Sequence, residues 1–468
     1  MKDILFVVFC AFLFLDACQP IDEKIVENPP TFLRFSSDTV SFDTVFTRLK
    51  TTTRRLTITN PDKNAIILTK IELFKGKESV FSLIINGRRE NQAENIRLLG
   101  NDSLLILIET LLPETGKDEP QKIEDELLVR FGEKEQRVKL LLWAQDAFFY
   151  DSPQKRHIIS RDTTWSARKP IVILDTLLLV SKGCMLTVEK GARIHFGNES
   201  ALYIGGTLHA TGTPQQPIYF QSLRLDRDYA FTPAQWKAIF FLEGSQNNLL
   251  EWAVVRNANV GLRIGTPDND ILPDVTVRYS IIKNMSVAGI QAFNSDVVLE
   301  NTLIFGCGQQ TVALVLGGNY TLTHNTIVAF NLLHRTRNCT PFARNTPSFL
   351  LSNFLNVSGQ TLSAPFSLTM TNNLLWGDLE EEVSKQIRAG IDFSIVARNN
   401  LIRTKDANFQ GNGNILNTNP RFAGKRCEDN FTLMRESPAV NAGTLTSLQL
   451  DLTGKLRDSK PDIGAFEF

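Results

Sequence analysis

A short strand motif recurs through the second half of the chain, and its spacing constrains the fold more than any other feature. Each copy starts with a polar or aromatic residue, continues with a small or polar one, and ends in two aliphatic residues. The copies start at Trp252, Tyr279, Asn301, Asn325, Asn372 and Asn399. The intervals are 27, 22, 24, 47 and 27 residues, and the long one fits two turns or one turn with an insertion. Such a period predicts units that stack because none buries its apolar face alone.

The sequence pattern around these motifs favours a right-handed parallel β-helix from about residue 150 to residue 468. Residues 186–196 alternate apolar and polar side chains, and Gly or Asn corners separate the short strands. Parallel strands joined in this way are expected to wind right-handed. A leucine-rich repeat has a similar period, but its LxxLxL signature is missing. The four asparagines Asn301, Asn325, Asn372 and Asn399 are expected to form a structural ladder, with side chains hydrogen-bonded along the axis.

Residues 31–146 are expected to form a separate antiparallel β-sandwich. Several short alternating runs are separated by turn signals such as Asn60-Pro61-Asp62, and helical periodicity is absent. The run Leu56-Thr57-Ile58-Thr59-Asn60 resembles Ig-like modules of the abnormal-spindle/hydin type, which are common in bacterial envelope proteins. The resemblance implies a spacer or interaction module. The whole chain is therefore predicted to be all-β.

Residues 1–18 have the features of a bacterial export signal. The apolar run 4–15 is too short to span a bilayer and has the length of a signal-peptide core. Its end resembles a lipobox, since Leu15, Ala17 and Cys18 match while Asp16 departs from the usual small residue. The resemblance implies lipidation at Cys18 and a lipid anchor in the outer membrane, on a side that the sequence does not define. Residues 19–30 would then be a tether; an ordinary secreted protein is the alternative.

The last 50 residues resemble the closing segment of many secreted bacterial β-helix proteins. The pattern includes Ser437-Pro438-Ala439 and the series Asp451, Arg457, Asp462 and Glu467. Because a solenoid end exposes unpaired strand edges, these four charged residues are expected to fix a C-terminal cap.

Charge and motif content limit the partners and cofactors that can be expected for this chain. Fifty basic and fifty acidic residues leave no basic excess, so no nucleic-acid partner is expected. Asp268, Asp270 and Asp274 share one loop and are candidate Ca²⁺ ligands, with a merely solvated loop as the alternative. No other cofactor is expected, and the catalytic residues are unassigned.

Three stretches interrupt the repeat, namely 224–235, 334–361 and 377–392, and the third is expected to contain a short helix. Function tends to lie on such loops beside a rigid scaffold. The favoured prediction is a monomeric, non-catalytic envelope lipoprotein that binds glycan, or an envelope protein or other component, along its helix surface. Because many right-handed β-helix proteins degrade polysaccharides, the alternative is a lyase or glycoside hydrolase acting on an acidic polysaccharide, with clustered charged side chains on one strand face.

Overall fold

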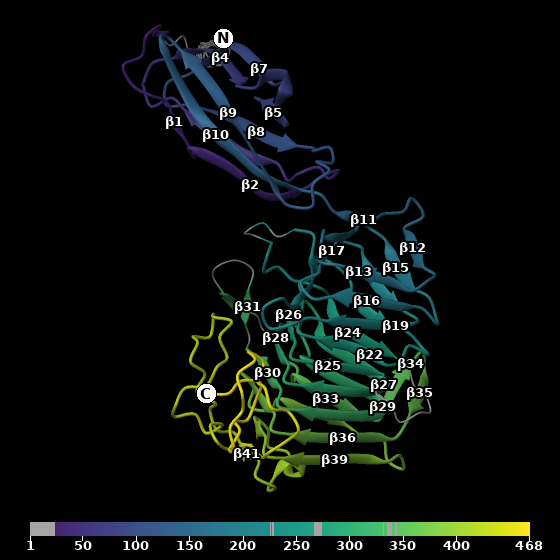
Figure 1. Cartoon of the computed structure of the whole chain (residues 1–468). Coiled ribbons are helices and arrows are strands. Elements are labelled where there is room, and N and C mark those ends of the chain that lie inside the picture. Colours follow the sequence, from purple (N-terminus) through teal and green to yellow (C-terminus); the bar gives the residue numbers. More distant parts are fainter. Residues whose placement is uncertain are drawn as a thin grey trace, which may run out of the picture. The chain divides into compact units, whose positions relative to one another are not determined.

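The computed structural model describes residues 24–224, 226, 229–265, 274–330, 332–334, 339–341 and 344–468 (Figure 1). The chain divides into two compact units between Asp146 and Ala147. The described residues form strands and two short 3-10 helices, η1 (Gly76–Glu78) and η2 (Ala407–Phe409). None of their helices is long and apolar enough to cross a membrane. The predicted all-β fold is confirmed.

The first unit is a sandwich of two five-stranded sheets. One sheet has the order β1 (Arg34–Phe35), β3 (Arg54–Thr59), β8 (Ser103–Thr110), β5 (Phe81–Ile85) and β6 (Arg88–Arg89). The other has the order β2 (Thr39–Phe46), β10 (Lys134–Gln145), β9 (Gln121–Phe131), β4 (Ile66–Leu73) and β7 (Gln92–Leu98). Alternate side chains of each strand point inward and form a single core between the sheets. The predicted antiparallel sandwich is confirmed, with one exception: β2 and β10 pair in parallel.

Residues 24–30, the described part of the expected tether, lie against this sandwich. Ile25 forms a parallel bridge with Ala65, and the Lys134 ammonium donates to the Pro29 carbonyl at 2.7 Å. Cys18 and the rest of residues 1–23 lie outside the described residues.

The second unit is a solenoid whose coils each contribute strands to three parallel faces. The first face contains β11 (Phe148–Tyr150), β14 (Ile171–Ile173), β17 (Arg193–Phe196), β20 (Ile218–Ser222), β23 (Ala253–Arg256), β26 (Ile281–Met285), β28 (Leu303–Cys307), β30 (Thr326–Ala329), β37 (Leu374–Gly377), β40 (Leu401–Ile402) and β41 (Ile415–Leu416). The second contains β12 (Arg156–Ile159), β15 (Leu177–Val180), β18 (Ala201–Ile204), β21 (Ile239–Phe241), β24 (Val260–Gly265), β33 (Phe349–Ser352) and β38 (Val383–Gln386). The third contains β13 (Thr163–Trp165), β16 (Met185–Glu189), β19 (Thr207–Thr211), β22 (Asn248–Glu251), β25 (Val275–Arg278), β36 (Phe366–Thr371) and β39 (Phe393–Arg398). The long strands β27 (Ala288–Glu300) and β29 (Val312–Thr323) belong to both the second and the third face.

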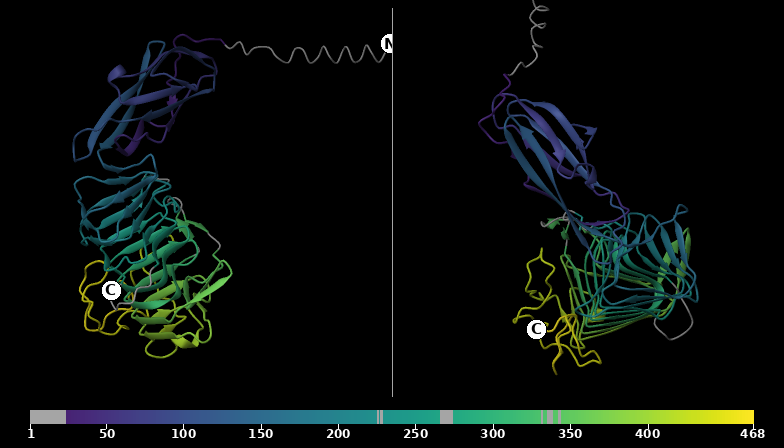
Figure 2. Two further views of the ribbon diagram at one scale, coloured as in Figure 1. Left: turned by 90° about the vertical axis from the view of Figure 1, so that its right-hand side faces the viewer. Right: turned by 45° about the horizontal axis from the view of Figure 1, so that its top comes forward.

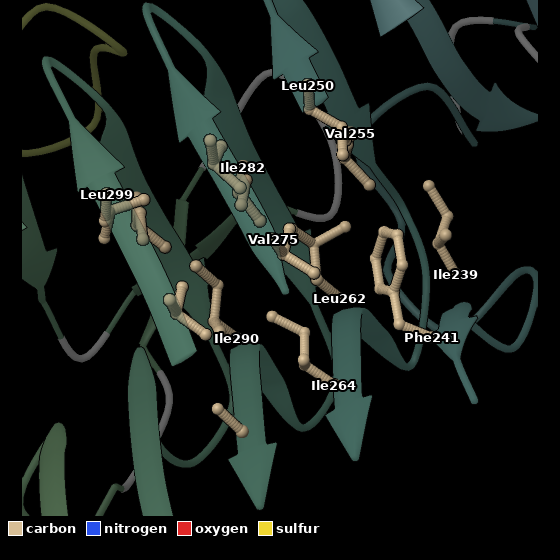
Figure 3. Close-up of a cluster of buried hydrophobic side chains, with 14 of the residues drawn as sticks. Ile239, Phe241, Leu250, Val255, Leu262, Ile264, Val275, Ile282, Ile290 and Leu299 are labelled. Atoms are coloured by element: carbon tan, nitrogen blue, oxygen red, sulfur yellow. The ribbon is translucent and has the colours of Figure 1, made fainter. Parts of the chain in front are cut away.

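Stacked aliphatic columns from the three faces fill the solenoid. On the first face, one continuous column is at most 1% exposed and consists of Ile194, Phe220, Val255, Ile282, Ile304, Ile327, Leu375 and Ile402. Figure 3 shows Val255 and Ile282 converging with Phe241 and Ile264 of the second face and Leu299 of the third. Burial of each such side chain contributes about 1.5–3 kcal/mol, so the columns are the main stabilising feature of the solenoid.

From β22 to β40, each coil turns from the third face to the first through a residue in the left-handed conformation. The φ angles at these corners are 50° at Trp252, 49° at Tyr279, 43° at Asn301, 55° at His324, 58° at Asn372 and 51° at Asn399. Asparagine tolerates this conformation better than most residues, which explains its recurrence. Because Leu303 pairs with Thr326, the partner of Asn301 is His324, and the sequence alignment was one residue off at Asn325.

Asn325 lies instead in a second, inner column that forms the hydrogen-bonded ladder. The main-chain N–H of Asn325 donates to Asn373 Oδ1 at 3.0 Å, and that of Asn373 donates to Asn400 Oδ1 at 2.7 Å. The N–H of Asn400 continues the series to Asn414 Oδ1 at 2.8 Å. The ladder thus runs one residue after the corner column that contains Asn301, Asn372 and Asn399.

The 47-residue interval is one turn with insertions. That turn consists of β30, β33 and β36, interrupted by the hairpins β31 (Leu332–His334) with β32 (Cys339–Pro341) and β34 (Phe354–Val357) with β35 (Gln360–Ser363). The short helix expected within 377–392 is wrong, because this stretch contains β38. Val383 continues the buried column below Phe349, and this packing between coils determines the conformation of the segment.

The C-terminal segment 420–468 lies along the outside of the first face and not over the end of the solenoid (Figures 1 and 2). The outward side chains of that face are apolar in its lower half, and they are buried against this segment. The end itself is closed by η2, whose Phe409 is fully buried, and by Lys385, whose ammonium pairs with Asp406 at 2.6 Å.

The four charged residues expected in the cap hold this lateral segment together. Arg457 pairs with Glu467 at 3.0 Å and donates to Asn301 Oδ1 at 2.7 Å. Asp462 accepts from the main-chain N–H of Asn441, while Asp451 accepts from that of Glu467. The corner asparagine Asn301 is therefore one of the attachment points of the segment.

Candidate functional site

The candidate calcium ligands are not brought together among the described residues. Asp268 and Asp270 lie outside the described residues. Asp274 is 2% exposed, and its Oδ2 accepts from the main-chain N–H of Asp296 at 2.9 Å, so this carboxylate stabilises a corner between coils. In the described parts of the chain, no group of three or more His, Cys, Asp or Glu side chains has the geometry to hold a metal ion.

The best-formed candidate surface is an outward column on the second face. Strand pairing aligns one outward residue from each successive coil, and alternation places them opposite the buried columns. From top to bottom the column contains Tyr203, Phe240, Arg263, Gln291, Ala313 and Leu350. Five steps of about 4.8 Å make it about 24 Å long.

The upper part of the column is an aromatic platform. The rings of Tyr203 and Phe240 are stacked, with centroids 4.5 Å apart and planes 4° from parallel. Phe240 also packs on a small buried cluster that includes Ala238 and Val260, which fixes its orientation. The Arg263 guanidinium follows, 5.9 Å from the Phe240 centroid and 5.2 Å from that of Phe293.

The lower part of the column is the floor of a groove of about 340 Å³ beside the β34–β35 hairpin. Phe293 and Phe354 are its aromatic residues, and Ala313, Val315, Leu350 and Leu355 are its aliphatic residues. The remaining lining residues are all carboxamides, namely Gln291, Gln310, Asn356 and Gln386. A few polar groups in an apolar cleft are typical of small-ligand sites, and carboxamides both donate and accept hydrogen bonds.

A charged row lies elsewhere, at the edge of the third face. Glu251, Arg278 and Glu300 occupy consecutive coils, and Arg278 Nε lies 2.8 Å from Glu251 Oε1. Burial raises the pKa of Glu300, and the positive charge of Arg278 opposes this shift. Beside the row, the rings of Trp252 and Tyr279 stack with centroids 4.7 Å apart.

Two histidines at outward strand positions of the solenoid, His195 and His209, differ in their surroundings. His195 points outward from the first face, as its register predicts, but is only 2% exposed. Its Nε2 lies 3.3 Å from Gln221 Nε2, and burial lowers its pKa to about 3. His209 lies on the third face with Nε2 3.0 Å from the Asn247 carbonyl oxygen. His195 therefore lacks the environment of a general base near neutral pH.

Sequence analysis missed the groove and the aromatic column entirely. Tyr203, Phe240 and Arg263 each precede or follow an aliphatic residue of the buried columns, so the outward positions of β18, β21 and β24 were a usable signal. The signal becomes visible only when strands from separate coils are aligned in register across their insertions.

The comparisons with known proteins bear on the solenoid. A family model for the right-handed β-helix region matches residues 188–327. The second unit therefore contains a right-handed parallel β-helix, as predicted. None of the curated proteins matches the chain.

Solved structures resemble the chain only weakly. The Vibrio cholerae VesB protease is 15% identical over 24% of this chain and 31% of its own, with a TM-score of 0.18. The Escherichia coli chaperone DraB is 13% identical over 25% and 55%, with a TM-score of 0.18. The catalytic unit of a GH87 alpha-1,3-glucanase from Streptomyces thermodiastaticus is 10% identical over 75% and 84%, with a TM-score of 0.23. This chain thus spans about a third of the protease and about half of the chaperone.

Proposed function

We propose that this protein is a non-catalytic envelope protein that binds a glycan chain along the outward column of its second face. The observation that carries the proposal is the continuity between the Tyr203–Phe240 platform and the carboxamide-lined groove, which share one column of adjacent strands. Among the described residues, the lining of the groove includes no carboxylate and no cation. Its chemistry therefore suits binding better than glycosidic bond cleavage.

The two parts of the column would contact different features of a sugar. The C–H groups of a pyranose pack against aromatic rings, and the rings of Tyr203 and Phe240 are stacked on each other in a fixed orientation. Hydroxyl groups both donate and accept hydrogen bonds, and the carboxamides of Gln291 and Gln386 do the same. A rigid solenoid keeps this arrangement in the absence of ligand, which lowers the entropic cost of binding.

The binding test uses the mature chain and polysaccharides coupled to a sensor surface. We expect Phe240→Ala to weaken binding about tenfold or more, because a buried ring contact is lost. Phe74→Ala is the matched control, since Phe74 is a 60% exposed ring on the sandwich. Equal binding by both variants, or no binding to any polysaccharide, would overturn the proposal.

We further propose that Cys18 anchors the protein to the outer membrane. Cys427 is disulfide-bonded, and such bonds persist in oxidising compartments such as the bacterial periplasm. Labelled palmitate should enter the wild-type protein but not Cys18→Ser, and the variant should move from the membrane fraction to the soluble fraction. Membrane retention of an unlabelled Cys18→Ser protein would contradict the anchor.

A glycoside hydrolase is the second candidate function, favoured by the charged row of the third face. Burial raises the pKa of Glu300, as a general acid requires, while Glu251 is ion-paired with Arg278. Two strand steps separate the glutamates by about 9.6 Å, near the upper end of the roughly 6.5–9.5 Å that inverting enzymes use.

This alternative predicts release of reducing ends from a polysaccharide panel. Glu300→Gln should abolish the release, whereas Glu189→Gln, in the same column but two coils above Glu251, should retain it. If no polysaccharide in the panel releases reducing ends or unsaturated products, the enzymatic function is excluded.

A further inference from the structure

Arg263 is an exposed cation in the middle of the proposed glycan track, and it has no partner of opposite charge. In the strand register, Arg263 lies between Phe240 of the coil above and Gln291 of the coil below. Its guanidinium lies over the Phe240 and Phe293 rings at 5.9 and 5.2 Å. Within the described chain, no carboxylate forms an ion pair with it.

Several other cations on the solenoid surface form ion pairs. Arg278 lies 2.8 Å from Glu251, Lys283 lies 2.7 Å from Asp429, and Lys237 lies 3.1 Å from Glu199. The neighbouring outward position on the same face is occupied by Gln291, where a glutamate could have formed an ion pair with Arg263. Among the described residues, Arg263 lies instead beside two aromatic rings and forms an ion pair with no carboxylate.

The Phe240 and Phe293 rings hold the guanidinium in a defined place. A guanidinium is always charged and presents a planar fork of donors that matches carboxylate, sulfate or phosphate oxygens. Stacking against rings limits its rotamers, so less entropy is lost when an anion binds.

We infer that the glycan bound on the second face is acidic and that Arg263 binds its anionic group, while uncharged sugar rings occupy the platform and the groove. This inference rests on the proposed function. Among the described residues of the track, Arg263 is the single cation over about 24 Å. The ligand is therefore a heteropolysaccharide with widely spaced acidic units, lying parallel to the solenoid axis, and not a densely charged polyuronate.

The test compares polymers that share a backbone and differ in charge. Gellan, which carries one glucuronate in each repeat, alginate and polygalacturonate are each measured beside their carboxyl-reduced forms, and dextran sulfate beside dextran. Binding of the mature chain is measured at low and at physiological salt. We expect about tenfold tighter binding to the acidic member of a pair, with the largest contrast for gellan.

Arg263→Gln should remove this preference but keep the binding to the reduced polymer that the platform provides. Arg398→Gln, an exposed arginine on the third face, is the matched control and should behave as the wild type. Far-ultraviolet circular dichroism checks that both variants are folded.

The outcomes separate this inference from the function on which it rests. Equal binding to both members of every pair, or binding to neutral members alone, overturns the acidic ligand and leaves the glycan-binding function standing. Retention of the acid preference by Arg263→Gln overturns the role of Arg263. Binding to no polymer in the panel overturns both proposals.

Discussion

Replacing Asn373 with alanine should destabilise the middle of the solenoid more than any change at an exposed asparagine. Asn373 Oδ1 accepts from the main-chain N–H of Asn325 at 3.0 Å and from its Nδ2 at 2.9 Å. Asn373 Nδ2 donates to the Leu322 carbonyl at 2.9 Å and to Asn400 Oδ1 at 2.9 Å. All of these asparagines are fully buried, so no water replaces the lost carboxamide.

The magnitude follows from the groups that the substitution leaves behind. The N–H of Asn325 loses the acceptor it has in the ladder, and the carbonyl of Leu322 loses a donor. Each buried polar group without a partner costs about 1–3 kcal/mol, so we expect a loss of about 2–4 kcal/mol. Asn319→Ala is the matched control, because Asn319 is exposed and its amide donates to Asp296 Oδ1 at 2.8 Å on the surface. Its expected effect is below about 0.5 kcal/mol.

Hydrogen exchange followed by mass spectrometry measures this loss where it occurs. A loss of about 2–4 kcal/mol corresponds to exchange about 30-fold to 900-fold faster in peptides that cover residues 320–330 and 370–376. Peptides from the sandwich should exchange as in the wild type, because that unit has its own core. Exchange in Asn373→Ala within threefold of that in Asn319→Ala would refute the assignment of the ladder as a stabilising element.

Three further predictions concern stability. Burial lowers the pKa of His195 and of His324 to about 3. Because the unfolded state then binds the additional protons, acidification from pH 7 to pH 5 should reduce the free energy of unfolding by about 2 kcal/mol for each histidine, and a flat urea midpoint over this range would contradict it. Gly377→Ala should lower the melting temperature because its Cβ would collide with the Glu382 carboxylate, whose bonds to Arg344 it would disrupt; an unchanged melting temperature would show that the pair can move. Phe409→Ala should cost about 3–5 kcal/mol by opening the end of the solenoid, and a loss below about 1 kcal/mol in guanidinium titrations would assign the closure to other residues.

The repeat period and the alternation were sufficient to predict a β-helix, but they did not fix its register. Asn301-Thr302 and Asn325-Thr326 look equivalent as text, yet Leu303 pairs with Thr326 and the corner residue is His324. A histidine in the left-handed conformation is uncommon, so the sequence contained no signal against the wrong alignment. Once the register is shifted by one residue, Asn325 aligns with Asn373 and Asn400, and the ladder follows.

Non-local packing explains the features that the sequence did not reveal. The acidic stretch before Val383 favoured a helix locally, but pairing of Val383 with Phe349 places it in a strand. The C-terminal segment covers the first face because Leu303, Phe305 and Leu374 point outward there and need burial. Their outward direction depends on register, and no local pattern identifies it.

The distribution of covering segments also distinguishes the second face from the first. The lower half of the first face is buried under the C-terminal segment, and that segment is fixed at corner residues such as Asn301 and Asn372. On the second face, the β34–β35 hairpin lies beside the column and forms a wall without covering the floor. Outward apolar side chains on the first face are therefore satisfied within the chain, whereas Tyr203 and Phe240 remain partly exposed. A stacked, oriented aromatic pair that continues into an open groove is a costly surface to expose to water unless it contacts a ligand.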